Sequence, residues 1–207
     1  MGLGACIDKV VEGSGWAKRR GKLGGKSGPR RGLGLACSSY LSGAGLPIYW
    51  NGMPHSGVQL KLDRSGLVTV FCGSTDIGQG SDSVLAYVVG EVLGIDPLGI
   101  RVVTADTDLT PVDLGSYSSR VTVMTGNAAM QAAEEARAIV ARGAAEKLGV
   151  PNNRLVFADS RVFDAEDPDV SMTFAQAIVE AESRYGTIGT VGSYKPPKSA
   201  ARFKGGG

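Results

Sequence analysis

Histidine and cysteine are scarce in this chain. Among 207 residues, His55 is the one histidine, and the three cysteines stand far apart, at positions 6, 37 and 72. An odd number of separated cysteines excludes a framework of paired disulfides, and no CxxC spacing is present. Zinc and iron–sulfur sites need grouped Cys or His ligands, so the sequence predicts neither within this chain.

The sequence also lacks long apolar runs and a large net charge. No run is long enough to span a bilayer, and residues 1–30 have no apolar core of a secretory signal peptide. The formal net charge is +2, which is too small for bulk electrostatic binding to nucleic acid. A hydrophobic content of 43% indicates a globular chain. We therefore expect a cytoplasmic protein that binds neither a membrane nor nucleic acid.

Glycine, by contrast, is abundant, with 31 residues in the chain, about twice the usual share. The stretch from 73 to 83 reads Gly-Ser-Thr-Asp-Ile-Gly-Gln-Gly-Ser-Asp-Ser and lies between apolar runs at 67–72 and 84–93. An apolar run, a glycine-rich turn and a second apolar run are typical of a strand that leads into a helix. We call residues 73–83 the Gly-Gln-Gly loop.

The residues of the Gly-Gln-Gly loop favour a bound polar ligand. Gly78 and Gly80 have no Cβ atom to keep a ligand from the backbone, and Ser81 is a good N-cap for the following helix. Free amides at a helix N-terminus suit an anionic group such as a phosphate. Gln79 adds an amide that both donates and accepts. The alternative is a tight turn with an exposed glutamine and no ligand.

A second loop of small polar residues, 115–120, also precedes a helix. It reads Gly-Ser-Tyr-Ser-Ser-Arg and follows a short expected strand at 100–105. The alanine-rich segment 125–148 after it is a strong helix former. We call residues 115–120 the serine loop. Two loops of this kind supply backbone donors that suit an anionic group such as a phosphate.

Four aspartates border these loops: Asp76, Asp82, Asp106 and Asp108. Carboxylates in such positions serve either as acids, bases and metal ligands or as caps and turn residues. Asp commonly fills the second role in loops. Each of the four lies in a turn or cap context without obvious burial to raise its pKa. We favour caps and turns over catalysis.

The remaining pattern predicts an α+β fold. Alternating apolar residues indicate an antiparallel hairpin at 58–62 and 67–72, and helical periodicity indicates two long helices at 81–93 and 125–148. Other expected elements are a short helix near 7–11, strands at 32–41, 155–163 and 187–194, and a helix at 173–182. A hairpin about Asp159-Ser160 is the alternative to a single strand at 155–163. The sheet should be mixed and mainly antiparallel, while the pattern leaves the strand order open.

Two further segments have unusual composition. Residues 18–31 contain seven Lys or Arg and no acid, which indicates either a patch for phosphate, RNA or an acidic partner, or a flexible, solvated linker. We favour the linker, because no aromatic residue is interleaved for base stacking. Residues 46–50, Leu-Pro-Ile-Tyr-Trp, form a loop too apolar to lie in water. We expect this loop to cover a core or to face a subunit or substrate channel.

The order of these motifs resembles the molybdenum-binding subunit of the xanthine dehydrogenase family. The hairpin, the Gly-Gln-Gly loop, the segment Ala105-Asp106-Thr107 and the serine loop follow one another as they do in that family, over about residues 30–195. Residues 36–43 (Ala-Cys-Ser-Ser-Tyr-Leu-Ser-Gly) and 51–57 (Asn-Gly-Met-Pro-His-Ser-Gly) are most similar to 4-hydroxybenzoyl-CoA reductase within the family. This subfamily match depends on one stretch of the chain.

The resemblance implies a cofactor that composition does not show. It would be a molybdopterin, in the cytosine dinucleotide form, carrying molybdenum. The implied cofactor-binding residues are Ile77, Gly78, Gln79, Gly80 and Ser81 in the first loop, and Ser118, Ser119 and Arg120 in the second. Tyr117 and Arg120 differ from the small residues of xanthine oxidases, so the contacts at these two positions are open. FAD and iron–sulfur clusters would belong to partner subunits.

The implied activity is the reductive removal of the ring hydroxyl of 4-hydroxybenzoyl-CoA, an aromatic CoA thioester. The alternatives are a molybdenum hydroxylase acting on an aldehyde, an N-heterocycle or CO, and a non-catalytic glycine-rich assembly module. The glutamate that acts as general base in the family would lie beyond the glycine run 205–207. We therefore expect the 207-residue chain to be inactive by itself.

These expectations divide the chain into three parts. Residues 1–31 would be the end of a preceding element and a basic linker, and residues 32–204 would be a partial molybdopterin-binding domain. Residues 205–207 would be a truncated glycine loop, because a domain rarely ends in such a run without a closing element.

Overall fold

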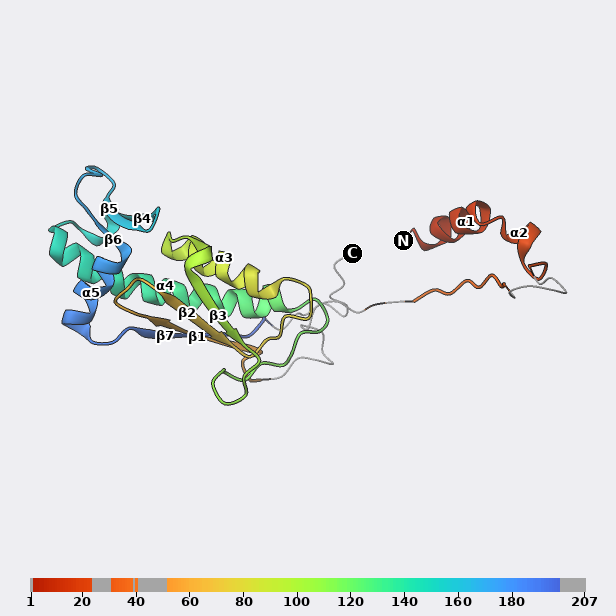
Figure 1. Cartoon of the computed structure of the whole chain (residues 1–207), viewed down its shortest axis with the longest axis horizontal. Coiled ribbons are helices and arrows are strands. Elements are labelled where there is room, and N and C mark those ends of the chain that lie inside the picture. The colour runs from red at the N-terminus through yellow and green to blue at the C-terminus, as the bar shows by residue number, and fades with distance from the viewer. Residues whose placement is uncertain (1, 24–30, 39, 41–51, 198–207) are drawn as a thin grey trace. The chain divides into compact units, whose positions relative to one another are not determined.

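The computed structural model describes residues 2–23, 31–38, 40 and 52–197. The chain divides into two compact units, Met1–Tyr40 and Leu41–Gly207. The first unit contains helices α1 (Leu3–Gly13) and α2 (Trp16–Arg19), and the second contains all the strands of the described part of the chain (Figure 1). The limits proposed from the sequence at residues 31 and 204 stay predictions.

The core of the second unit is a four-stranded sheet in the order β3-β2-β1-β7. Its strands are β1 (Ser56–Leu62), β2 (Val68–Cys72), β3 (Ile100–Thr104) and β7 (Gly189–Tyr194). β1 pairs antiparallel with β2 and β7, while β2 pairs parallel with β3. A parallel pair needs a crossover, which α3 (Ser81–Leu93) and the 3-10 helix η1 (Pro97–Gly99) supply. The mixed, mainly antiparallel sheet and the predicted hairpin are confirmed.

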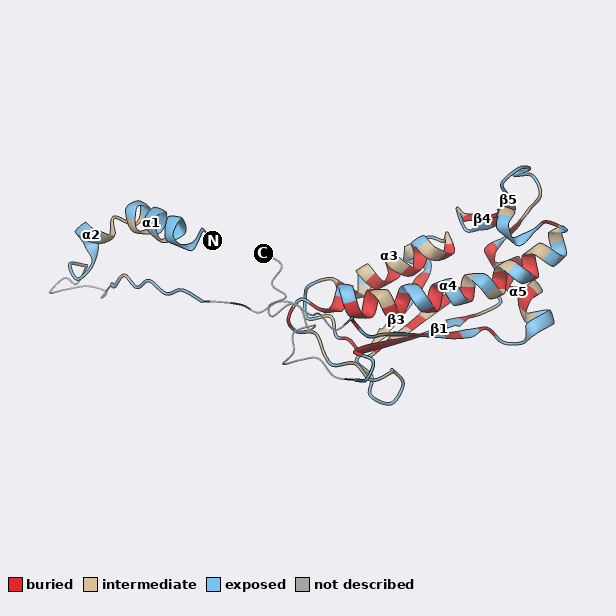
Figure 2. Ribbon diagram, turned by 180° about the vertical axis from the view of Figure 1, so that it is seen from behind, coloured by how far each residue is buried: buried red, intermediate tan, exposed pale blue. Residues whose placement is uncertain are grey.

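Helices α3 and α4 (Val121–Leu148) lie on one face of this sheet (Figure 2). The periodicity of α3 predicted an apolar stripe of Val84, Val88 and Val92, with Leu85, Val89 and Leu93 beside it. The second set is fully buried, whereas the three valines of the first set are only half-buried. Half of the buried residues of α4 are alanines, whose small side chains allow neighbouring elements to approach closely. At Gly192 of β7, an added Cβ atom would overlap the carbonyl oxygen of Ala128 in α4.

A smaller antiparallel sheet in the order β4-β5-β6 follows α4 and the 3-10 helix η2 (Asn152–Arg154). Its strands are β4 (Leu155–Ala158), β5 (Arg161–Asp164) and β6 (Ser171–Thr173). Asp159 and Ser160 form the β4–β5 turn with positive φ angles, so the hairpin at this point is confirmed. α5 (Phe174–Tyr185) starts with a capping box and contacts α4.

Two predictions about the first part of the chain were wrong. Residues 32–38 and 40 form no strand, because alternation alone supplies no neighbour for the backbone hydrogen bonds of a strand. Lys18 and Arg19 are helical in α2 rather than in a loop, and Arg20 lies 5.2 Å from the ring centre of Trp16. Residues 24–30 of the basic segment and the apolar loop 46–50 lie outside the described residues. The short helix near residues 7–11 is confirmed as α1.

Helix α4 starts at Val121, four residues before the expected position. Its first three residues, Val121, Thr122 and Val123, are all β-branched and therefore weak helix formers. Val121 and Met124 are buried, and this packing outweighs the local preference. No helix within the described ranges is long and apolar enough to cross a membrane.

Candidate functional site

The Gly-Gln-Gly loop and the serine loop are in contact. The backbone N–H of Thr75 donates to Ser116 Oγ at 2.9 Å, and Ser116 Oγ donates to the carbonyl oxygen of Thr75 at 2.6 Å. An added Cβ atom at Gly73 would overlap the carbonyl oxygen of Pro111, so the Gly-Gln-Gly loop also packs closely on the segment just before the serine loop. The fold therefore brings together two loops that are 41 residues apart in the chain. A cleft shared by residues 78–81 and 118–120 stays a prediction.

The glycines of the Gly-Gln-Gly loop leave open space at its surface. Gly78 and Gly80 have φ angles of +101° and +80°, and an added Cβ atom would meet nothing within 4 Å at either position. Ile77 is 71% exposed. Gln79 turns back onto the loop: its Oε1 accepts from the N–H of Ile77, and its Nε2 donates to Thr75 O and Ser81 Oγ. The glutamine side chain therefore braces the loop.

The start of α3 differs from the sequence prediction. The N-cap is Gly80, and Ser81 is the first helical residue without a side-chain cap bond. The capping function belongs to Asp76, whose Oδ1 accepts from the N–H groups of Gly78 at 2.8 Å and Gly80 at 3.3 Å. Its Oδ2 accepts from the N–H of Asp82 at 3.2 Å. One amide of the first helical turn, that of Asp82, and two amides of the preceding loop are therefore engaged by a carboxylate of the chain itself.

Asp76 and Asp82 have pKa values shifted in opposite directions. Hydrogen bonds from the backbone, that from Gly78 foremost, hold the pKa of Asp76 below its ordinary value. Burial raises the pKa of Asp82, and the nearby charge of Asp76 adds to the rise. Thr104 Oγ1 donates to Asp82 Oδ2 at 3.4 Å. The expectation that these aspartates lack burial to raise a pKa was wrong for Asp82, while Asp76 and Asp106 are turn residues as predicted.

The serine loop ends in a tight turn. Ser118 and Ser119 both have positive φ angles, +55° and +52°, and the N–H of Arg120 donates to Tyr117 O at 3.2 Å. Two successive positive φ angles define a type I′ turn, which normally uses Asn or Gly. Each non-glycine residue in this region costs roughly 1–3 kcal/mol, and such strain concentrates at functional sites. Ser118 is buried and Ser119 is exposed, so Ser119 is the serine of this turn that faces outward.

Arg120 supports the serine loop from within. Its side chain is fully buried and forms an ion pair with Asp113, which is also fully buried, at 2.7 Å. It also donates to Gly115 O at 2.7 Å, His55 O at 2.5 Å and Ser56 Oγ at 2.8 Å. The side chain of Arg120 therefore points into the protein interior. The predicted contact between the cofactor and Arg120 is left to the backbone of this residue, and it stays a prediction.

The sequence analysis missed the partners of Arg120. Asp113, His55 and Ser56 were not among the candidate residues, and the last two lie 64 or 65 residues away on or beside β1. No local pattern in the sequence signals the contacts of Arg120 with His55 and Ser56, because these contacts depend on which strand lies beside the loop. Among the described residues, no group of three or more His, Cys, Asp or Glu is arranged to hold a metal ion.

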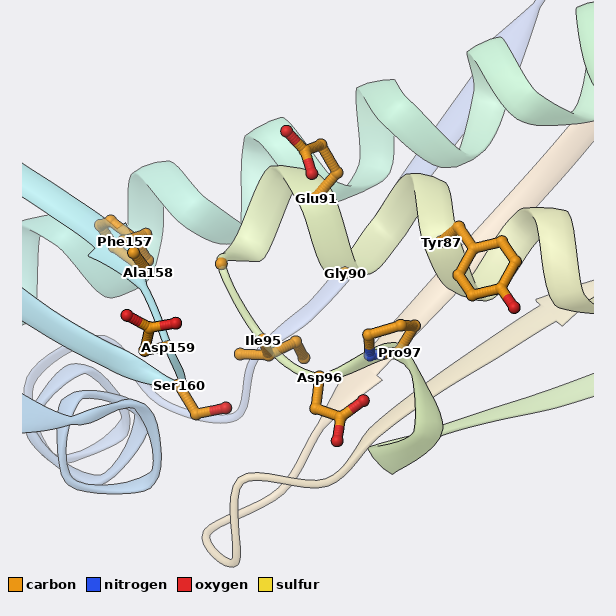
Figure 3. Close-up of a pocket in the computed structure, with 11 residues that line it drawn as sticks. Tyr87, Gly90, Glu91, Ile95, Asp96, Pro97, Phe157, Ala158, Asp159 and Ser160 are labelled. Carbon is orange, nitrogen blue, oxygen red and sulfur yellow. The ribbon is translucent and has the colours of Figure 1, made fainter.

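A separate groove of about 650 Å³ lies beside the C-terminal half of α3 (Figure 3). It is lined by Tyr87, Gly90, Glu91, Gly94, Ile95, Asp96, Pro97, Phe157, Ala158, Asp159 and Ser160. None of these residues belongs to the Gly-Gln-Gly loop or the serine loop. Asp96 is also occupied as the cap of η1, where it accepts from the N–H of Leu98 at 2.9 Å. The two loops, rather than this groove, are the candidate site.

Comparison with known proteins gives a consistent family. The xanthine dehydrogenase molybdenum-binding subunit of Escherichia coli O157:H7 is 37% identical over 134 residues, which cover 64% of this chain and 17% of that protein. The 6-hydroxypseudooxynicotine dehydrogenase complex subunit gamma of Paenarthrobacter nicotinovorans is 42% identical over 103 residues, covering 50% and 12%. This chain thus spans less than a fifth of the length of these relatives.

Comparison with solved structures leads to the same family as comparison with the sequences. A reconstituted CO dehydrogenase from Oligotropha carboxidovorans superposes with a TM-score of 0.67 at 25% identity, over 76% of this chain and 21% of that chain. The family model described as the molybdopterin cofactor-binding domain matches residues 9–206. This chain therefore belongs to the molybdopterin cofactor-binding domain of the xanthine dehydrogenase family.

Proposed function

We propose that this chain is the cofactor-binding part of the catalytic subunit of a molybdenum hydroxylase-type oxidoreductase. The observation that carries the proposal is the contact between the Gly-Gln-Gly loop and the serine loop in a molybdopterin cofactor-binding domain. When bound, the molybdenum cofactor supplies the redox chemistry, and the residues of this chain bind and orient it. Relatives named as xanthine and carbon monoxide dehydrogenases support this reaction class.

The surface of the Gly-Gln-Gly loop fits an uncharged group that forms hydrogen bonds. Open space beside Gly78 and Gly80 admits such a group to the backbone. A phosphate fits poorly at the start of α3, because Asp76 already accepts from the amides there. We therefore assign Ile77, Gly78 and Gly80 to the pterin part of the cofactor. Ser119, the exposed serine of the second loop, is the candidate donor to its polar groups.

A glycine replacement tests whether the backbone of this loop approaches the cofactor. Asn tolerates the left-handed conformation of Gly80 better than other residues, so Gly80→Asn should preserve the start of α3 while placing a Cβ atom in the open space. We expect molybdenum bound by the intact subunit to fall roughly tenfold, as measured by inductively coupled plasma mass spectrometry.

The control is Gly149→Asn at the C-terminal end of α4. Gly149 also has a positive φ, +70°, and open space around an added Cβ atom, but it lies outside both loops. This variant should retain molybdenum. Equal retention in both variants would refute the proposed approach of the cofactor at Gly80.

The narrower hypothesis is that the intact enzyme reduces 4-hydroxybenzoyl-CoA. It is supported by the similarity of residues 36–43 and 51–57 to that reductase, and part of each stretch lies outside the described residues. The hypothesis includes the cytosine dinucleotide form of the cofactor, partner subunits with FAD and iron–sulfur clusters, and an aromatic CoA thioester as substrate. Relatives named for xanthine, nicotine and carbon monoxide favour instead a hydroxylase or a carbon monoxide dehydrogenase.

Substrate assays separate these two candidates. The intact enzyme should be tested by viologen-linked reduction of 4-hydroxybenzoyl-CoA and by dye-linked oxidation of purines, aldehydes, N-heterocycles and CO. Reduction of the thioester alone is the expected result of the narrower hypothesis. Turnover of the oxidisable substrates alone would refute it and retain the hydroxylase class, and no turnover in an enzyme that contains molybdenum would contradict both.

A further inference from the structure

The carboxylate of Asp76 occupies the place that an external anion takes at many helix N-termini. Its two oxygens accept from the N–H groups of Gly78, Gly80 and Asp82, at 2.8, 3.3 and 3.2 Å. Amides at the start of a helix attract negative charge because they are unpaired and lie at the positive end of the helix dipole. Here the attracting groups and the anion belong to the same short segment.

The other polar groups of the loop are also engaged within it. Gln79 accepts from the N–H of Ile77 at 2.6 Å and donates to Ser81 Oγ at 3.0 Å and to Thr75 O at 3.1 Å. The loop is thus closed by two side chains, Asp76 and Gln79, that point back onto its own backbone. Such a closed set of hydrogen bonds holds one conformation before any ligand arrives.

The charge around the loop disfavours a second anion. Asp82 lies in the first turn of α3, and its Oδ1 is buried without a hydrogen-bond partner. Burial first, and then the nearby charge of Asp76, raise the pKa of Asp82 above its ordinary value. A phosphate at the same amides would add further negative charge to this pair and would have to displace a carboxylate tethered to the chain.

We propose that Asp76 is a positioning residue: an internal anion that sets the Gly-Gln-Gly loop in its binding conformation and excludes phosphate from the start of α3. The part of this proposal that concerns the cofactor depends on the proposed function. The part that concerns the loop conformation and phosphate does not. Asp76 need not touch the cofactor, since it acts through the amides of Gly78, Gly80 and Asp82.

The loop itself is tested in the 207-residue chain. In Asp76→Ala, amide hydrogen exchange at Gly78 and Gly80 should rise by about tenfold or more, because the bonds to the carboxylate are lost. Titration with inorganic phosphate, followed by NMR shifts of the same amides, should show binding in Asp76→Ala and none in the unsubstituted chain. Asp76→Asn keeps one acceptor oxygen and should restore most of the protection.

The control is Asp106→Ala. Asp106 also accepts from backbone amides, those of Asp108 and Leu109, but it lies outside the Gly-Gln-Gly loop. This variant should leave exchange at Gly78 and Gly80 unchanged. The proposal is overturned if the unsubstituted chain binds phosphate at these amides, or if Asp76→Ala keeps its protection. Circular dichroism of each variant shows whether the fold is retained.

Cofactor retention tests the remaining part in the intact subunit. Asp76→Ala should lower bound molybdenum severalfold, Asp76→Asn should recover most of it, and Asp106→Ala should match the unsubstituted subunit. Unchanged molybdenum in Asp76→Ala would overturn the role toward the cofactor. If the unsubstituted subunit binds no molybdenum, the proposed function fails, while exchange and phosphate titration still decide the role of Asp76 in the loop.

Discussion

Replacing Gly192 with alanine is expected to prevent the second unit from folding. The added Cβ atom would overlap the carbonyl oxygen of Ala128, a backbone atom within α4. Neither element yields easily, because β7 pairs along its length with β1 and α4 is held by buried residues on the sheet. Overpacking a core typically lowers the free energy of unfolding by about 1–3 kcal/mol. An overlap with helix backbone should cost at least the upper value of this range.

Thermal unfolding followed by circular dichroism measures this effect. The control is Gly189→Ala in the same strand, where the added Cβ atom would lie 3.7 Å from Leu60 O, an ordinary contact. Gly189→Ala should unfold near the temperature of the unsubstituted chain, whereas Gly192→Ala should show no cooperative transition or one lowered by many degrees. Similar midpoints for both variants would contradict the close packing of β7 on α4.

Replacing Arg120 with methionine is expected to destabilise the second unit by about 3–5 kcal/mol, the usual cost of breaking a buried ion pair. The change leaves Asp113 as a buried charge without its partner. It also removes the donors that Arg120 directs to His55 O and Ser56 Oγ. Because these bonds join the serine loop to β1, we also expect increased mobility of residues 115–120.

Urea unfolding provides the measurement, and Arg64→Met is the matched control. Arg64 pairs with Glu182 at 2.8 Å, but its side chain is 79% exposed, so its loss should cost no more than about 1 kcal/mol. The double variant Arg120→Met, Asp113→Leu should recover part of the loss, since a buried apolar pair is often tolerated in place of an ionic one. Equal stability of Arg120→Met and Arg64→Met would contradict the buried role of Arg120.

Much of the fold was predictable from local pattern. Alternation identified the β1–β2 hairpin, and helical periodicity identified α3, in which Leu85, Val89 and Leu93 are the fully buried residues. Glycines ended α3 and α4 at the expected positions, Gly94 and Gly149. These features depend on residues that are neighbours in the chain, and therefore a sequence displays them directly.

Two failures of the sequence predictions share one cause. The segment 32–41 has an alternating pattern but no strand in its described part, and α4 starts earlier than its β-branched first turn predicts. In both cases, contacts with other segments decide the outcome: a missing strand partner in the first, and the burial of Val121 and Met124 in the second. Propensity is a weak signal wherever tertiary packing acts on the same residues.

The features of the candidate site likewise divide into those visible in the sequence and those visible only in the tertiary structure. The sequence by itself determined that two loops of glycine and serine each precede a helix, and their order along the chain indicated the family. Only the tertiary structure decided that a hydrogen bond between Thr75 and Ser116 joins these loops. It also decided that the Asp76 carboxylate accepts from backbone amides beside the start of α3, and that the Arg120 side chain points into the protein. The physical reason is that these contacts depend on strand order and on left-handed backbone turns, which bring together groups that no periodicity relates.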